Sequence, residues 1–186
     1  MEMRITSEVL HDYPHVQVGC LVLHDYAGCS REGITRLVND TQDIARKHVS
    51  DRQMITQHPV IERWHEAYRS FGAKPKKHKV SLERLLEQAI SGANLGVNAL
   101  VDLYNVISLR YLIPVGAFDV DTLSGDIQLR KALAEETPVT LLGEQMERAP
   151  QEQEVIYADE QGAICRRWNW KEAHRSRITE DTRNIV

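Results

Sequence analysis

The strongest constraint on the fold is a change in the spacing of apolar side chains near Pro114. Between about residue 31 and Pro114, apolar residues recur every three or four positions, as on one face of a helix. After it, they fall in short alternating runs separated by glycines, as in strands. Helices in the middle of the chain and strands toward the ends favour an α+β domain whose sheet is covered by helices.

The helical part of the pattern divides into separate amphipathic segments. Ser30 and Ser81 are suitable N-caps, and Pro59 suits a first helical position because its missing N–H would be unpaired there. The predicted helices extend over residues 31–49, 59–72, 81–92 and 99–109, the second and third ending at a glycine.

The strand pattern predicts a sheet built mainly from the last third of the chain. One earlier strand is expected at residues 15–23, where the apolar residues include Cys20 and suggest burial on both faces. Short runs at 117–121, 126–131 and 139–142 are further candidates. Residues 154–159 and 163–168 flank the turn Glu160–Gln161–Gly162 and predict a β-hairpin.

Length and composition are typical of a single domain covering residues 1–186, without repeats or a long linker. A mean hydropathy of -0.41 and the absence of a long apolar run exclude a membrane span. The N-terminus does not resemble a signal peptide, and an odd set of three cysteines favours a reducing compartment. We therefore expect a cytoplasmic protein, and nothing in the sequence indicates its oligomeric state.

The net charge of -4 excludes binding to nucleic acid through overall charge, so an RNA contact needs a local basic patch. Two candidates are the loop 74–79 and the segment 166–183, which includes Trp168 and Trp170. Guanidinium groups can clamp phosphates and indoles can stack on bases. The alternatives are a solvated loop and two tryptophans that pack in the core.

Short motifs for covalent, metal or nucleotide chemistry are absent. No Gly-x-Ser-x-Gly elbow and no Gly-rich phosphate loop occurs. His65–Glu66 begins like a zinc-protease helix, but Arg69 stands where the second histidine belongs. Cys20, His24 and Cys29 do not have the spacing of a closed zinc site. We expect no metal and no cofactor.

One helix carries an unexpected polar stripe. Asp102, Asn105 and Ser108 recur every three positions in an otherwise apolar segment. Buried polar groups without partners are costly, by about 1–3 kcal/mol each. The stripe therefore either faces solvent or lines a polar pocket.

Residues 97–108 (VNALVDLYNVIS) and 114–119 (PVGAFD) together are distinctive. They resemble the editing domain (B-three/B-four) of the phenylalanyl-tRNA synthetase β subunit, where an Asn-Pro-x-Val-Asp-x-Thr-Asn helix leads into a Pro-x-His-Ala-Phe-Asp strand. The ending 178–184 is similar to that domain's closing Asp-Glu-Thr-x-Asn segment. The resemblance extends over residues 59–186, is weak over 1–58, and is strongest to free-standing relatives of the domain.

The resemblance implies a three-layer α/β sandwich with a pocket for the 3′ end of a mischarged tRNA. The family hydrolyses an aminoacyl ester by water attack, without a covalent intermediate. The implied partner is therefore tRNA, with neither DNA nor a membrane as a partner.

The resemblance also assigns site residues. Asn105 matches the pocket asparagine, and the pocket glutamate falls near Glu172 or His174, so these three are the catalytic candidates. Tyr104 stands where the family has threonine, and Gly116 stands where it has histidine. The substrate-binding candidates are Asp102, Tyr104, Gly116, Ala117, Phe118, Trp168 and Asn169, and the RNA-binding candidates are Lys74, Lys76, Lys77, Lys79, Arg166, Arg167 and Arg175.

The leading hypothesis is a trans-acting aminoacyl-tRNA deacylase. The absence of the family histidine at Gly116 motivates the alternative, a non-catalytic module that binds tRNA or a small amino-acid-like ligand. A pocket that serves an unrelated small molecule is a third possibility.

Overall fold

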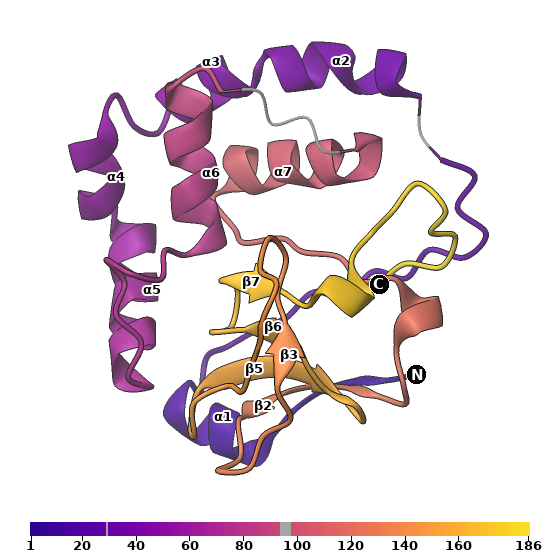
Figure 1. Ribbon diagram of the computed structural model, residues 1–186. Helices are drawn as coiled ribbons and strands as arrows, with labels where there is room; N and C mark the ends of the chain where they lie inside the picture. The colour runs from indigo at the N-terminus through magenta and orange to yellow at the C-terminus, as the bar shows by residue number, and fades with distance from the viewer. Residues whose placement is uncertain (29, 94–97) are drawn as a thin grey trace. The chain divides into compact units, whose positions relative to one another are not determined.

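The computed structural model describes residues 1–28, 30–93 and 98–186, so Cys29 and the start of the segment 97–108 lie outside the described residues. The chain forms two compact units (Figure 1). Met1–Tyr26, Phe71–Ala73 and Ala117–Val186 form the sheet unit, and Ala27–Ser70 and Lys74–Gly116 form the helical unit. Helices together with a mixed sheet confirm the predicted α+β class, and the single-domain assignment stays a prediction.

The sheet unit contains a five-stranded sheet with the order β1-β2-β5-β6-β7. β1 runs parallel to β2, and the other neighbours are antiparallel. A second, two-stranded sheet pairs β3 with β4, and α1 packs against β2. The unit also contains two short 3-10 helices, η1 and η2. The elements are β1 (Met3–Ile5), α1 (Ser7–Asp12), η1 (Val120–Thr122), β2 (Ile127–Lys131), β3 (Val139–Thr140), β4 (Glu147–Arg148), β5 (Val155–Asp159), β6 (Gly162–Arg166), β7 (Lys171–Glu172) and η2 (His174–Ser176).

The predicted hairpin at 154–168 is confirmed as β5 and β6. Gly162 has a φ of 123°, which glycine adopts without the steric strain of a Cβ atom. Apolar residues of β2, β5 and β6 supply much of the core of this unit, with Leu129, Ile156 and Ile164 fully buried. Burial alternates along the start of β2 and is almost continuous along β5 and β6.

The end of the chain is held by short backbone pairings that the sequence did not reveal. Phe118 and Val186 exchange two backbone hydrogen bonds of 2.8 and 3.1 Å, and Leu23 and Ile185 exchange two of 2.9 Å. Ile185 also bridges Asp119. The predicted strand 117–121 is therefore only a single bridge that continues into η1.

The predicted strand at residues 15–23 is wrong. Only Leu23 pairs, as an isolated bridge with Ile185, while Leu21 is 72% exposed and Cys20 is exposed. Alternating apolar residues form a strand only where they can pair with a neighbouring strand. The edge positions of the five-stranded sheet are occupied by β1 and β7, and residues 15–23 pair with neither.

The helical unit contains six helices in its described residues. Caps explain several of their ends, because Asp51 and Asn98 each accept a hydrogen bond of 2.9 Å from the backbone N–H three residues later. The bounds are α2 (Arg31–Asn39), α3 (Thr41–Arg46), α4 (Arg52–Gln57), α5 (Pro59–Ser70), α6 (Ser81–Ile90) and α7 (Ala99–Tyr111). None of the helices described is both long and apolar enough to cross a membrane.

The segment 31–49, predicted as one helix, is interrupted at Asp40. This residue ends α2 and precedes α3. The Thr41 hydroxyl donates to the Val38 carbonyl at 2.7 Å, and such local bonds compete with regular helix pairing. The helices predicted from 59, 81 and 99 are confirmed, with α7 extending two residues further than expected.

Candidate functional site

The polar stripe of α7 has different roles along its length. Asp102 and Ser108 are buried and Asn105 is half-buried. The Ser108 hydroxyl donates to the Ile113 carbonyl at 2.5 Å, just beyond Leu112, which has left-handed backbone (φ 53°). Ser108 therefore stabilises the end of α7, while the Asn105 amide has no hydrogen-bond partner among the residues described.

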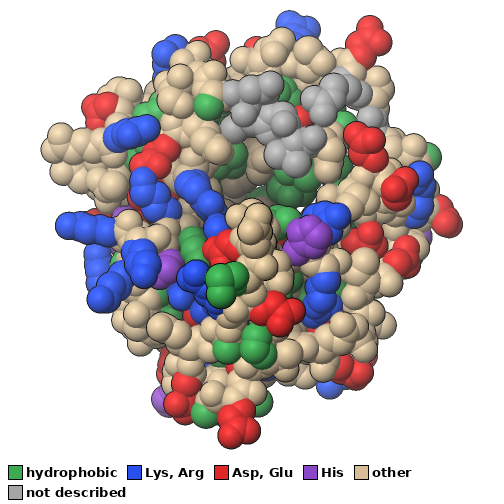
Figure 2. Space-filling view, in the orientation of Figure 1, with side chains coloured by type: hydrophobic (Ala, Val, Ile, Leu, Met, Phe, Trp, Pro, Cys, Tyr) green, Lys and Arg blue, Asp and Glu red, His purple; other side chains and the backbone are tan. Residues whose placement is uncertain are grey.

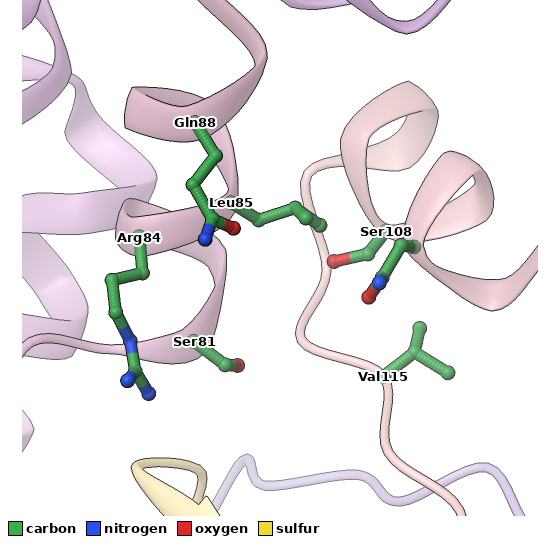
Figure 3. A pocket seen from close by; sticks show the side chains of 7 residues that line it. Ser81, Arg84, Leu85, Gln88, Ser108 and Val115 are labelled. Atoms are coloured by element: carbon green, nitrogen blue, oxygen red, sulfur yellow. The ribbon is translucent and has the colours of Figure 1, made fainter. Parts of the chain in front are cut away.

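A cavity of about 220 Å³ lies between α6 and α7 of the helical unit. Figure 3 shows Leu85 and Ser108 pointing toward one another from the two helices, with Arg84 and Gln88 extending from α6. The walls are Ser81, Arg84, Leu85, Gln88, Asn105, Ser108 and Val115.

Sequence reasoning identified the α7 side of this cavity and missed the α6 side. Ser81, Arg84 and Gln88 recur at positions i, i+3 and i+7, the spacing of one helical face. That spacing is a signal, but an exposed polar face has the same pattern. Only the position of α7 distinguishes the two.

Glu172 lies on the edge strand β7 of the sheet unit. Cross-strand pairing places Tyr157, Cys165 and Glu172 in one row on the same face of the sheet. Neither Tyr157 nor Cys165 supplies a positive charge to this row. Burial raises the pKa of Glu172 to about 7. No described residue makes a hydrogen bond or ion pair with its carboxyl group.

His174 follows in η2 and is exposed. Arg177 Nη1 lies 3.0 Å from His174 Nδ1. Because a guanidinium group only donates, Nδ1 acts as the acceptor and the ring hydrogen is assigned to Nε2. In this arrangement His174 presents a donor outward.

Three candidate residues of the segment 166–183 are buried. Arg166 is 3% exposed and donates to both oxygens of Glu154 at 2.9 and 2.8 Å, and Arg167 is 6% exposed. Trp168 is 5% exposed, with its ring 4.8 Å from that of Tyr13. Arg166, Arg167 and Trp168 therefore do not form an exposed RNA-binding surface; the core alternative holds for Trp168.

The lysines of the loop 74–79 differ from those arginines. Lys74, Lys76 and Lys77 are exposed, whereas Lys79 contacts Glu87 at 2.6 Å. Figure 2 shows Lys and Arg side chains gathered on the side of the molecule where Figure 1 places α5.

The other candidates are divided between the units. Tyr104 is half-buried and Gly116 is exposed, both in the helical unit, and Asn169 is half-buried in the sheet unit. Ala117 is buried, and the Phe118 ring lies 6.3 Å from that of Tyr157. Arg175 makes an ion pair with Asp159, whose pKa is lowered by this guanidinium despite burial.

The chain belongs to the B3/4 domain family, whose model matches residues 63–186. The phenylalanine–tRNA ligase β subunit of Psychrobacter arcticus is 40% identical over 89 residues, 48% of this chain and 11% of that protein. The corresponding subunit of Fusobacterium nucleatum is 37% identical over 69 residues, 37% of this chain and 8% of that protein. The chain thus matches only a small part of the length of these relatives.

Proposed function

We propose that this protein is a cytoplasmic, trans-acting deacylase that hydrolyses the ester of a mischarged aminoacyl-tRNA. The observation that carries the proposal is the carboxyl group of Glu172, which has a pKa of about 7 and no partner among the described residues. A general base is most effective when its pKa is close to the working pH. Membership of the B3/4 family supplies the substrate class.

In the proposed reaction, the Glu172 carboxylate accepts a proton from water as the water oxygen attacks the ester carbonyl carbon. A tetrahedral oxyanion forms and then collapses, which breaks the bond between the carbonyl carbon and the ribose oxygen. The Glu172 carboxylic acid returns its proton to that oxygen. The products are the free amino acid and a tRNA with a free terminal hydroxyl.

His174 has a supporting role in this proposal. The Nε2–H of His174 donates a hydrogen bond to the substrate. The interaction of His174 Nδ1 with Arg177 favours Glu172 over His174 as the base.

The direct experiment measures release of amino acid from a panel of mischarged tRNAs. We expect at least one to be deacylated faster than in buffer, and Glu172→Gln to lower that rate by about 100-fold or more, the usual contribution of a general base. Glu152→Gln, at an exposed position, is the matched control. Failure to deacylate any member of the panel would refute the proposal.

Asn105→Ala separates a binding role from a structural one. It should lower deacylation and leave folding intact, because Asn105 makes no hydrogen bond to the described part of the chain. Asn105 and Glu172 belong to different units. A double-mutant cycle with Glu172→Gln tests whether the two residues act on the same step.

One observation favours a second function, a non-catalytic module that binds tRNA or a small amino-acid-like ligand. Gly116 occupies the position of the family histidine, so one polar group of the pocket is missing. This function predicts tRNA binding that weakens steeply with salt, without hydrolysis, and an unchanged affinity in Glu172→Gln.

A further inference from the structure

One face of the five-stranded sheet carries a row of side chains that ends at Glu172. Cross-strand pairing places Leu129 of β2, Tyr157 of β5, Cys165 of β6 and Glu172 of β7 side by side on this face. Ile156 follows the strand alternation to the opposite face, where it belongs to a separate core cluster. Whatever covers the first face therefore controls access to Glu172.

The segment 14–22, which we call the strap, begins beside this row. It contains no helix or strand, and it follows Tyr13, whose ring lies edge-on to that of Trp168 at 4.8 Å. The Trp168 side chain in turn makes a hydrogen bond with Tyr157. Burial raises the pKa of Tyr157 to about 12, and Cys20 adds to this rise. Cys20, within the strap, therefore lies near the Tyr157 hydroxyl group.

The strap also ends beside this row. Leu23, the next residue, exchanges two backbone hydrogen bonds of 2.9 Å with Ile185. The neighbouring Val186 pairs with Phe118, whose ring lies 6.3 Å from that of Tyr157. Both ends of the strap are thus fixed to residues that surround Tyr157, and the strap passes along the face that carries Glu172.

Between its two ends the strap is held by few contacts. Residues 17–22 make no hydrogen bond with the described part of the chain. Val18 is half-buried, whereas Gln17 is exposed and Leu21 is 72% exposed. Segments with few buried contacts and no backbone hydrogen bonds open at a lower free energy than the core does. The strap can therefore leave the sheet while the rest of the unit stays folded.

We propose that the strap covers the row of Tyr157, Cys165 and Glu172 and opens as a lid that admits the substrate to Glu172. The inference rests on the proposed function for the role of Glu172, whereas the opening itself does not depend on it. Cys165 is 5% exposed when the strap is closed. Because Cys165 and Glu172 are cross-strand neighbours, opening exposes both, and the Cys165 thiol can report it.

The experiment measures the rate at which the thiol reagent DTNB labels Cys165. The full chain carries Cys20→Ser and Cys29→Ser, so that Cys165 is the thiol that reacts. We expect labelling at urea concentrations far below the unfolding transition, at a rate that hardly changes with urea, as for local opening. A labelling rate with the same steep urea dependence as global unfolding would overturn the proposal.

Variants of the strap test whether it is the part that moves. Tyr13→Ala removes the ring contact with Trp168 and should speed labelling at least tenfold. Val18→Ser covers the case in which Tyr13→Ala does not fold, and it should speed labelling at least threefold because it loses apolar contact. Gln17→Ser, at the exposed neighbouring position, is the matched control and should change the rate less than twofold. An unchanged rate in Val18→Ser, or equal changes in Val18→Ser and Gln17→Ser, would overturn the proposal.

The outcome is distinguishable from that of the proposed function. On a tRNA that the protein deacylates, Val18→Ser should raise kcat/KM by the same factor as the labelling rate, because a larger fraction of the protein is open to substrate. An unchanged kcat/KM would overturn the role of the strap as a lid. Local opening without deacylation of any tRNA would refute the enzyme and support the opening. Deacylation together with labelling only through global unfolding would do the reverse.

Discussion

Glu154 and Glu172 belong to the same unit but have opposite surroundings. Glu154 is 1% exposed and accepts hydrogen bonds from the Arg166 guanidinium and from the Arg167 backbone N–H at 3.1 Å. Glu172 lies at the sheet edge beside Cys165, with no cation paired to it in the described structure, and its pKa is about 7. The Glu154 carboxylate neutralises a buried arginine, whereas the Glu172 carboxyl group changes charge near neutral pH and can transfer a proton.

The largest expected effect is the loss of the paired carboxylate. Glu154→Gln keeps the side-chain shape and leaves the Arg166 charge buried without its counter-charge. The free energy of unfolding, measured with urea, should fall by about 3–5 kcal/mol. Glu152→Gln, at an exposed position, should change it by less than about 0.5 kcal/mol. A loss below about 1 kcal/mol for Glu154→Gln would show that its ion pair with Arg166 does not stabilise the fold as the comparison with Glu172 requires.

The same substitution at the second glutamate should have the opposite sign. The carboxyl of Glu172 titrates near 7 in the folded protein and near 4.5 in the unfolded chain, so the folded state holds more protons between these values. Stability contributed by this group is therefore present below about pH 4.5 and declines as the pH rises to about 7. Glu172→Gln should stabilise the protein by about 1–3 kcal/mol at pH 8 and have almost no effect at pH 4.5.

Urea unfolding at several pH values measures this difference. The Glu152→Gln variant should follow the wild-type pH dependence. If Glu172→Gln destabilises the protein at pH 8, the carboxylate has a stabilising partner and the comparison with Glu154 fails.

Asp119 provides an intermediate case, a buried carboxylate with an uncharged partner. Its Oδ2 accepts a hydrogen bond of 2.7 Å from the Thr182 hydroxyl, and both residues are buried. Thr182→Val should lower the free energy of unfolding by about 1–2 kcal/mol. Thr137→Val, at an exposed threonine, is the control, and an equal change in both variants would contradict this role for Thr182.

The smallest effect is expected at a partly exposed ion pair. Lys79 Nζ lies 2.6 Å from Glu87 Oε1, with 36% of the lysine side chain exposed. Lys79→Met should cost less than about 1 kcal/mol in thermal unfolding, because solvent screens the pair. If Lys79→Met destabilised the protein as much as Glu154→Gln, burial would not determine how much an ion pair contributes to stability.

The sequence predicted the elements that depend on local signals. Pro59 starts α5 and the turn at Gly162 joins β5 to β6, because helix starts and turns depend on neighbouring residues. The predicted caps are less accurate, since Ser30 makes no side-chain capping bond and Ser81 is the first residue of α6, after Val80. The parallel pairing of β1 with β2 brings Met3 beside Ile127. Residues so far apart in the sequence carry no local pattern that predicts their pairing. The failed strand at 15–23 has the right alternation and lacks strand neighbours.

The candidate site was predictable in part for the same reason. Asn105 followed from a polar stripe within one helix, whereas the α6 wall with Arg84 depends on packing between two helices. Arg166 was assigned to an RNA surface because its run of basic residues is visible in the sequence. Its buried partner Glu154, twelve residues earlier, is visible only in the fold.

The most direct test of the account is the pH dependence of deacylation from pH 5.5 to 8.5, with wild type and Glu172→Gln compared on one mischarged tRNA. We predict that the wild-type kcat/KM, after subtraction of the rate in buffer, rises tenfold per pH unit below about 7 and then levels off, because the Glu172 carboxylate is the active form. Glu172→Gln should lose this inflection together with most of the rate. An unchanged inflection near 7 in Glu172→Gln would contradict the assignment of Glu172 as the base.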